Sequence, residues 1–293
     1  MKSPLQAVPV FFRPEMVAEA DSFSPSASKP RQVVADWQAH GLLIELRTFE
    51  PVDEGTLALA HDPSYVRGVL AGTAINGFGN RRPEVAASLP YTSGAMLAAA
   101  RAALASGQVS CAPVSGFHHA CHGHAEGFCT FNGLMVAALA LKRDGRADRV
   151  GILDLDHHWG NGTEDIIAKL KISWAQHHTS GRQRPDPNDA GPYLARIESL
   201  VGSFADCDVL LYQAGADAHV KDPLGGWMTS EQLAERDRKV FETAARIGLP
   251  VAWNLAGGYQ LGRDGSLSPV LEIHRQTMRA CAAAFVRGRQ HRG

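Results

Sequence analysis

The stretch that decides the fold reads Gly151-Ile-Leu-Asp-Leu-Asp-His-His-Trp-Gly-Asn-Gly-Thr163, an apolar run that ends abruptly in carboxylate and imidazole side chains. Val150, Ile152 and Leu153 have the β-branched or apolar character of a strand that is covered on both faces. The glycine-rich turn that follows leads into Glu164-Asp-Ile-Ile-Ala, which is typical of a helix. We therefore predict a βα unit with its polar residues at the carboxyl end of a buried strand, where ligands bind in open parallel sheets.

Composition is that of a globular protein without a strong charge. The chain has 293 residues, with 29 Lys and Arg against 30 Asp and Glu, so its formal net charge is -1. This balance disfavours electrostatic binding to nucleic acid or to a membrane surface, and we interpret the basic tail at 287–293 as a solvated terminus. Because there is no apolar run of about 18 residues and no signal-peptide core at the start, we expect a cytoplasmic protein.

The cysteines form an odd, dispersed set without a CxxC pair. Such a set fits reduced thiols better than a disulfide framework or a thiolate zinc site. The five are Cys111, Cys121, Cys129, Cys207 and Cys281.

Strand-like and helix-like segments alternate along the whole chain, with no repeat and no break in composition. Strands are predicted at 7–12, 42–46, 110–114, 150–154, 170–174, 207–213 and 249–255, and a polar loop at 177–188. Pro9 places the first strand at an edge of the sheet or makes it the start of the strand. Helices are predicted at 32–40, 56–72, 93–106, 131–142, 192–204, 230–247 and 267–286. The fold class is therefore α/β, with residues 1–293 as a single three-layer domain around a mostly parallel central sheet.

Four of the predicted strand ends carry polar residues. A single buried histidine or aspartate is more often a satisfied structural residue than a ligand. Four strand ends that converge on one edge of a sheet favour a functional site instead. These ends are residues 115–124, 154–163, 213–219 and 254–259.

Two carboxylates and one imidazole would make a three-ligand site for zinc or another divalent metal, with positions open for water and substrate. In an extended segment alternate residues face the same way, so Asp156 and His158 point together, with Asp217 as the natural third ligand. Asp154 with His157 is nearly as good a pair, and spacing favours the first pair only modestly.

The same segments carry a family resemblance. The chain resembles the superfamily of histone deacetylases and acetylpolyamine amidohydrolases, whose members have an arginase-like α/β fold. The matching motifs follow the family's order between about 61 and 259 and are Gly116-Phe-His-His-Ala, Gly127-Phe-Cys-Thr-Phe-Asn132, Asp154-Leu-Asp-His-His-Trp-Gly-Asn-Gly-Thr163, Ala214-Gly-Ala-Asp-Ala-His219, Asp222-Pro-Leu-Gly-Gly226 and Gly257-Gly-Tyr259.

The resemblance implies a role for each matched residue. It makes Asp156, His158 and Asp217 the ligands of one zinc ion and His118 and His119 the tandem active-site histidines. Asp154 would pair with the first of these and Asn161 with the second, while Tyr259 would face the metal across the substrate carbonyl. Gly127 and Phe128 would form the wall of an acyl-lysine channel. A monovalent cation such as K+ would lie near Asp154 and Ser173.

The partners of the two histidines predict their roles. His119, backed by a neutral amide, should be the less basic imidazole and act as general base and later as acid. His118, backed by Asp154, should be cationic.

Some positions depart from the family's pattern. Trp159 stands where relatives usually have histidine, and His157 where they often have an aliphatic residue. The loop at 177–188 also lacks the glycine- and proline-rich sequence that is usual in the family. The substrate is therefore not carried over by the resemblance.

The sequence thus predicts a metal-dependent amidohydrolase, a deacetylase of bacterial type that acts on N-acyl lysine or a related acylated amine. Hydrolysis of acetylpolyamines or other small amides is the alternative. A two-metal ureohydrolase is disfavoured because its site needs further aspartates. A catalytically silent acyl-lysine binder is kept open by His157 and Trp159, although His118, His119 and Tyr259 argue against it. Assembly into a homo-oligomer is left open.

Overall fold

The computed structural model of the chain describes residues 5–183 and 186–286. In this part of the chain a seven-stranded parallel sheet has the order β2-β1-β3-β7-β6-β4-β5. The strands are β1 (Val8–Phe11), β2 (Ile44–Arg47), β3 (Val109–Ser115), β4 (Val150–Asp154), β5 (Ala175–Thr179), β6 (Val209–Gly215) and β7 (Val251–Ala256).

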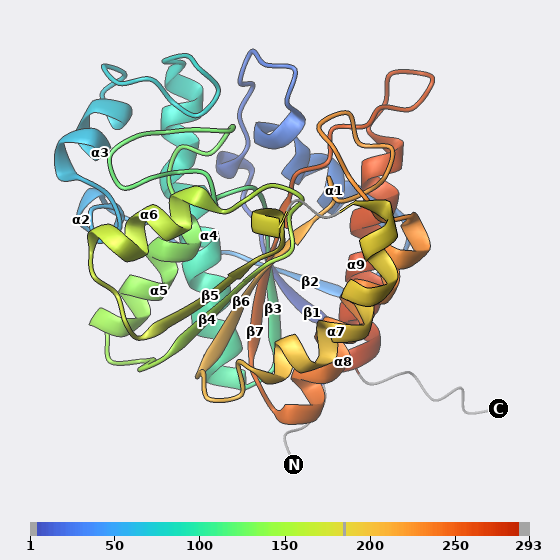
Figure 1. Cartoon of the computed structure of the whole chain (residues 1–293). Helices are drawn as coiled ribbons and strands as arrows, with labels where there is room; N and C mark the ends of the chain where they lie inside the picture. The colour runs from blue at the N-terminus through green and yellow to red at the C-terminus, as the bar shows by residue number, and fades with distance from the viewer. Residues whose placement is uncertain (1–4, 184–185, 287–293) are drawn as a thin grey trace.

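Helices cover both faces of the sheet, as Figure 1 shows. One face packs against α1 (Lys29–Ala39), α7 (Ala190–Gly202), α8 (Ser230–Ile247) and α9 (Ser268–Phe285). The other face packs against α2 (Glu54–Leu57), α3 (Pro63–Leu70), α4 (Pro83–Ser106), α5 (Gly133–Arg143) and α6 (Asn161–Lys169). The three-layer α/β fold with a parallel sheet, predicted from the sequence, is confirmed.

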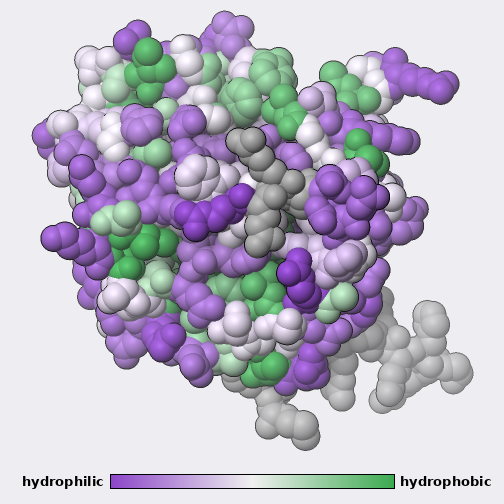
Figure 2. Space-filling model, viewed as in Figure 1, coloured by the Kyte–Doolittle hydropathy of each residue, from purple (hydrophilic) through white to green (hydrophobic). Residues whose placement is uncertain are grey.

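The central strands are apolar because both of their faces are covered. Every residue of β3, β4, β6 and β7 is buried. By contrast β2, at one edge of the sheet, is mostly exposed. On the outer surface the apolar residues lie in small separate patches among hydrophilic ones on the face drawn in Figure 2.

The prediction of a strand at 170–174 is wrong, because this segment closes α6 and β5 follows it. Leu170 caps α6, Lys171 has a positive φ of 53°, and the amide of Ile172 donates to the carbonyl of Ile167 at 2.9 Å. β5 itself, Ala175–Thr179, is a polar edge strand that is only partly buried. It therefore lacks the apolar signal from which a buried strand is predicted.

Four neighbouring strands bring the polar segments together. Asp154 of β4 pairs with Gln213 of β6, which pairs with Asn254 of β7, which in turn pairs with Ala112 of β3. Since the strands are parallel, the segments that follow them leave the sheet at the same edge. On the opposite side of the sheet, where the strands begin, the amide of Leu5 donates to the carbonyl of Phe285 at 3.3 Å, and Leu5 forms a β-bridge with Val286.

Two further expectations concern the rest of the chain. All five cysteines are buried and unbridged, in agreement with the prediction of free thiols. Among residues 5–183 and 186–286, no helix has the length and apolar character needed to cross a membrane. The basic tail at 287–293 lies outside the described residues.

Candidate active site

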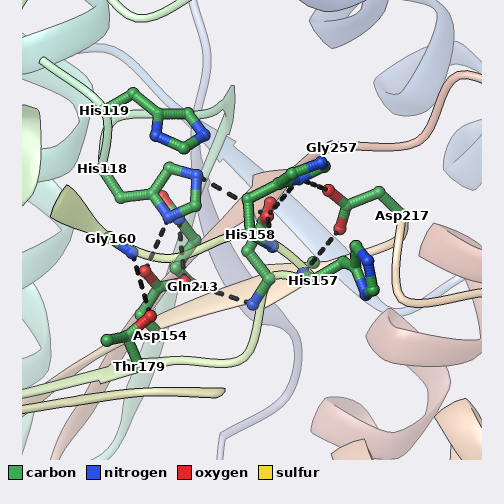
Figure 3. A network of polar contacts seen from close by, with 12 residues as sticks. His118, His119, Asp154, His157, His158, Gly160, Thr179, Gln213, Asp217 and Gly257 are labelled. Atoms are coloured by element: carbon green, nitrogen blue, oxygen red, sulfur yellow. Dashed lines mark hydrogen bonds and ion pairs between the residues drawn. The ribbon is translucent and has the colours of Figure 1, made fainter. Parts of the chain in front are cut away.

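The centre of the site is a group of two carboxylates and one imidazole beyond the ends of β4 and β6. The Nδ1 atom of His158 lies 3.2 Å from Oδ1 of Asp156 and 2.9 Å from Oδ2 of Asp217. Both aspartates are buried, with exposed fractions of 2% and 0%. Figure 3 shows His158 between the end of β4 and the Asp217 side chain. One ligand atom from each of the three residues lies within 4.8 Å of the other two.

Electrostatics favour a cation at this group. Burial and the nearby charge of Asp156 raise the pKa of Asp217. Burial alone would lower the pKa of His158, but hydrogen bonds to the two carboxylates and their charges outweigh it and raise the pKa to about 11. A divalent cation would satisfy both carboxylates in place of that proton. Two carboxylate oxygens and one imidazole nitrogen are a donor set that zinc accepts, so the residues fit a metal.

The alternative pair, Asp154 with His157, is separated in the structure. Asp154 accepts from His118 at 2.7 Å and from the side-chain amide of Gln213 at 3.0 Å. The backbone amide of His157 donates to Asp217 at 3.1 Å, while a Cβ atom on Gly225 would lie only 2.4 Å from the His157 ring. The structure therefore brings together Asp156, His158 and Asp217, and it turns the His157 ring away from them.

His118 and His119 lie beside this group, with ring centroids 4.0 Å apart. Nδ1 of His118 is 2.7 Å from Oδ2 of Asp154, and its Nε2 is 3.6 Å from Asp156. Burial opposes the charge on His118, but Asp154 and Asp156 prevail and raise its pKa to about 9. Burial and the neighbouring His118 charge lower the pKa of His119 to about 4. The two imidazoles therefore differ in their affinity for a proton.

His119 is held by residues on two sides. Its Nδ1 lies 2.6 Å from Oδ1 of Asn161, at the start of α6. The Asn161 amide nitrogen donates in turn to Oε2 of Glu126 at 2.9 Å. On the other side Gly127 has a φ of 53°, and a Cβ there would lie 2.4 Å from Cδ2 of His119. Sequence reasoning did not identify Glu126, because a glutamate in a polar loop carries no periodic signal.

A pocket of about 730 Å³ opens beside His119 and His158. Its rim includes Trp159, which is 44% exposed, and the Arg182 guanidinium lies 5.8 Å from the Trp159 ring centroid. Arg182 belongs to the predicted loop at 177–188, of which 184–185 lie outside the described residues. Trp159, one of the positions that depart from the family's pattern, thus forms part of the pocket mouth.

Aromatic side chains line the other side of the site. Phe128, with a φ of 64°, lies edge-on to Phe23 at 5.2 Å and 5.8 Å from the Tyr259 ring. Tyr259 shares a narrow cleft with His118 and Asp156, and burial raises its pKa. Phe23 was missed by sequence reasoning, because it is a lone phenylalanine in a Ser/Pro-rich loop.

Two buried charged residues position the chain around Tyr259. The backbone amide of Tyr259 donates to Asp222 at 2.8 Å, and burial raises the pKa of Asp222 to about 6. The ammonium of Lys29 donates to the carbonyl of Gly257, and burial lowers the pKa of Lys29 to about 8. Nothing in the sequence marks Lys29 as part of the site, because it is the first residue of an ordinary helix.

The expectation for Ser173 is wrong, because this residue is exposed at the amino end of β5. Ser180 lies near Asp154 instead. Its hydroxyl is 2.8 Å from the carbonyl oxygen of Asp156 and 3.5 Å from that of Asp154.

Comparisons with known proteins agree with this geometry. The model of the histone deacetylase domain family matches residues 25–183 and 189–271. An uncharacterised protein of Picosynechococcus is 32% identical over 256 residues, which cover 75% of this chain and 83% of that protein.

Solved structures show the same fold. The HD domain of HDA15 superposes with a TM-score of 0.77 at 18% identity, covering 97% of this chain and 91% of that one. An acetylpolyamine aminohydrolase from Burkholderia pseudomallei gives a TM-score of 0.71 at 17% identity, covering 95% and 99%. The family match spans well over half of the chain and includes the metal-type group, both active-site histidines and Tyr259. The chain therefore belongs to the histone deacetylase family, and it is an amidohydrolase of the deacetylase type.

Proposed function

We propose that this enzyme hydrolyses the amide of N-acyl lysine or a closely related acylated amine, with one zinc ion held by Asp156, His158 and Asp217. The observation that carries the proposal is a pair of adjacent imidazoles, one with a raised and one with a lowered pKa. They lie beside a buried group of two carboxylates and one imidazole. Zinc bound there supplies Lewis acidity toward a carbonyl oxygen and toward water.

In this proposal His119 moves the proton. Its low pKa keeps the ring neutral at pH 7, and the Asn161 carbonyl oxygen holds the hydrogen on Nδ1. The lone pair on Nε2 can therefore take a proton from the attacking water. The same nitrogen then delivers that proton to the leaving amine, so the imidazole ends the reaction neutral.

The other residues stabilise negative charge as the amide carbonyl is attacked. The charge of Asp154, which accepts from its Nδ1, favours the cationic form of His118. Tyr259 keeps its phenolic hydrogen, because its pKa is raised, and can donate to the developing oxyanion. Gly127 and Phe128 would hold the acyl-bearing chain of the substrate.

Two further parts of the proposal concern the surroundings of the site. The carbonyl oxygens of Asp154 and Asp156 and the hydroxyl of Ser180 are hard donors that suit a monovalent cation such as K+. We also propose that the chain acts as a single catalytic domain.

A small acylated polyamine is the second candidate substrate. The carboxylate of Glu126 lines the pocket beside His119, where it can attract a cationic amine, while Arg182 lies elsewhere on the rim. N-acyl lysine in a peptide and an acylated polyamine differ in the number of positive charges near the scissile amide. They can therefore be separated by their dependence on salt.

The test is a panel of acetyl-lysine peptides, longer acyl-lysine peptides and acetylated polyamines, combined with metal analysis. We expect one metal ion per chain and acid release that stops after chelation and returns with zinc. Turnover that resists the chelator would contradict the metal mechanism. Tight binding of acyl-lysine without turnover would favour a silent binder.

A further inference from the structure

Two hydrogen bonds in series connect a rim carboxylate to His119. The His119 Nδ1 lies 2.6 Å from the Asn161 carbonyl oxygen, and the Asn161 amide nitrogen donates to Oε2 of Glu126 at 2.9 Å. The two ends of an asparagine amide are nearly equal in size but opposite in hydrogen-bonding character. Shape alone therefore does not decide which end faces His119.

The orientation of this amide determines where the His119 ring carries its hydrogen. When the carbonyl oxygen faces Nδ1, a neutral ring carries hydrogen on Nδ1 and keeps a lone pair on Nε2. When the NH2 group faces Nδ1, the hydrogen moves to Nε2. That nitrogen then donates and cannot accept a proton from water.

Glu126 is the group that distinguishes the two orientations. An ionised carboxylate can only accept, so it pairs with the NH2 end of Asn161 and repels the carbonyl end. The side-chain hydrogen bonds of Asn161 in the described part of the chain are those to His119 and Glu126. Its backbone is fixed at the start of α6, where its amide donates to the carbonyl of Trp159 at 2.8 Å.

Glu126 is itself held by a tight turn. Its backbone amide donates to the carbonyl of Cys129 at 3.1 Å, and the amide of Cys129 donates back at 2.8 Å. Gly127 in the same turn packs on the His119 ring. One turn thus fixes both the plane of the ring and the acceptor that orients Asn161.

We propose that Glu126 is a positioning residue that keeps the Asn161 carbonyl oxygen on His119 and so holds His119 in the tautomer that can accept a proton. The inference rests on the proposed function, because it gives His119 the role of base.

The first part of the test measures kcat and KM for Glu126→Ala and for the isosteric Glu126→Gln, loaded with one equivalent of zinc. The zinc is limited to one equivalent because Glu126 also lies within 4.8 Å of ligand atoms of Cys121 and His124, where excess metal would compete for it. We expect Glu126→Ala to lower kcat about tenfold, with little change in KM for an acetyl-lysine peptide. Glu126→Gln should give a smaller loss, because a Gln amide accepts either orientation of Asn161.

The second part repeats both changes in an Asn161→Asp background. A carboxylate at 161 accepts from Nδ1 whichever way it rotates, so removal of Glu126 should then cost less than about twofold, or increase kcat. Glu164→Gln is the matched control, since Glu164 is a nearby carboxylate that does not line the pocket and pairs with Arg182 at 2.8 Å. It should leave kcat within about twofold of wild type.

The third readout is independent of turnover. Nitrogen-15 NMR distinguishes the two imidazole tautomers, and the His119 signals can be assigned by their loss in His119→Ala. We expect the Nδ1–H form in wild type and a mixture in Glu126→Ala. Equal losses of kcat in both backgrounds, a loss in Glu164→Gln as large as in Glu126→Gln, or an unchanged tautomer would overturn the inference. A wild-type protein without turnover would overturn the proposed function, while the NMR result would still decide the inference.

Discussion

Two neighbouring histidines with nearly touching rings bind protons very differently, because different groups lie behind them. Asp154 and Asp156 offset the cost of burial for His118, whereas His119 has only a neutral amide and a cationic neighbour. Residue identity alone would make the two equivalent. Their roles therefore follow from the partners that α6 and the end of β4 bring to each ring.

His119→Ala is expected to lower kcat by about a hundredfold to ten-thousandfold, the usual contribution of a general base. The metal content should not change, because His119 is not among the three grouped ligands. Steady-state kinetics with elemental analysis checks both. Turnover near the wild-type level would remove His119 from its proposed role.

Tyr259→Phe should lower kcat by about a hundredfold to a thousandfold while leaving the melting temperature nearly unchanged. The backbone amide, and not the phenol, makes the bond to Asp222, so the loop keeps its anchor. Kinetics and thermal unfolding of the same preparation separate the two effects. If the variant turns over normally, the oxyanion must be stabilised by another group.

Some members of the candidate site could be predicted from the sequence, because their residue types indicate the chemistry. Asp156, His158 and Asp217 could be grouped because carboxylate and imidazole side chains at strand ends suggest a metal. Glu126 and Lys29 could not, because their importance depends on what they face. A glutamate in a loop and a lysine at a helix start are ordinary until the fold places them beside Asn161 and Gly257.

At the scale of elements, glycine turns hold the metal group in place. Gly257 follows β7 with a φ of 51°, and a Cβ there would lie 2.2 Å from Cγ of Asp217. We expect Gly257→Ala to weaken zinc binding about tenfold to a hundredfold by displacing Asp217. A competition assay with a chromophoric chelator measures this change.

Gly265→Ala is the matched control. Gly265 has a φ of 77°, but no heavy atom lies within 4 Å of the added Cβ. This change should cost roughly 1 kcal/mol of folding free energy through backbone strain and leave zinc affinity unaltered. Equal effects of the two changes on zinc binding would mean that strain, and not displacement of Asp217, is responsible.

Buried strands were predictable and edge strands were less so. β4, β6 and β7 are buried throughout and mostly apolar, and each was located to within about two residues of its observed bounds. β5 was misplaced because its Gln-His-His sequence faces water on one side. Pro9 was expected at an edge of the sheet or at the beginning of its strand. β1 lies between β2 and β3, with Pro9 as its second residue, and its pairing with β3 is confined to Val10 and Cys111. That short contact tolerates a residue without an amide hydrogen.

For the whole molecule, His61 joins three distant segments and must be neutral to do so. Its Nε2 accepts from the backbone amide of Asn132 at 2.8 Å. Its Nδ1 therefore carries the hydrogen, which it donates to the carbonyl oxygen of Cys121 at 2.9 Å. Burial lowers the pKa of His61 from 6.5 to about 4. Protonation would break the bond from Asn132.

Folding stability should therefore decrease as the pH falls from 6.5 to 4. The unfolded chain takes up a proton on His61 near pH 6.5, whereas the folded chain does so only near pH 4. The stabilisation is thus complete above pH 6.5, and roughly 3 kcal/mol is lost by pH 4, at about 1.4 kcal/mol for each pH unit. Urea unfolding at several pH values measures the slope.

His61→Gln should flatten that slope, since glutamine can donate and accept without titrating in this range. His40→Gln provides the control, because His40 is exposed near the end of α1. Identical slopes in wild type and His61→Gln would show that other groups account for the acid sensitivity.

The bridge between Leu5 and Val286 has a practical consequence for handling the enzyme. The bridge lies at the edge of the sheet opposite to the strand ends that carry the site. A bead, a sensor chip or a fluorescent protein attached at Leu5 or Val286 would be held on the far side from the pocket. The enzyme could thus be immobilised near either of these residues while the pocket beside His119 and His158 still faces the bulk solution.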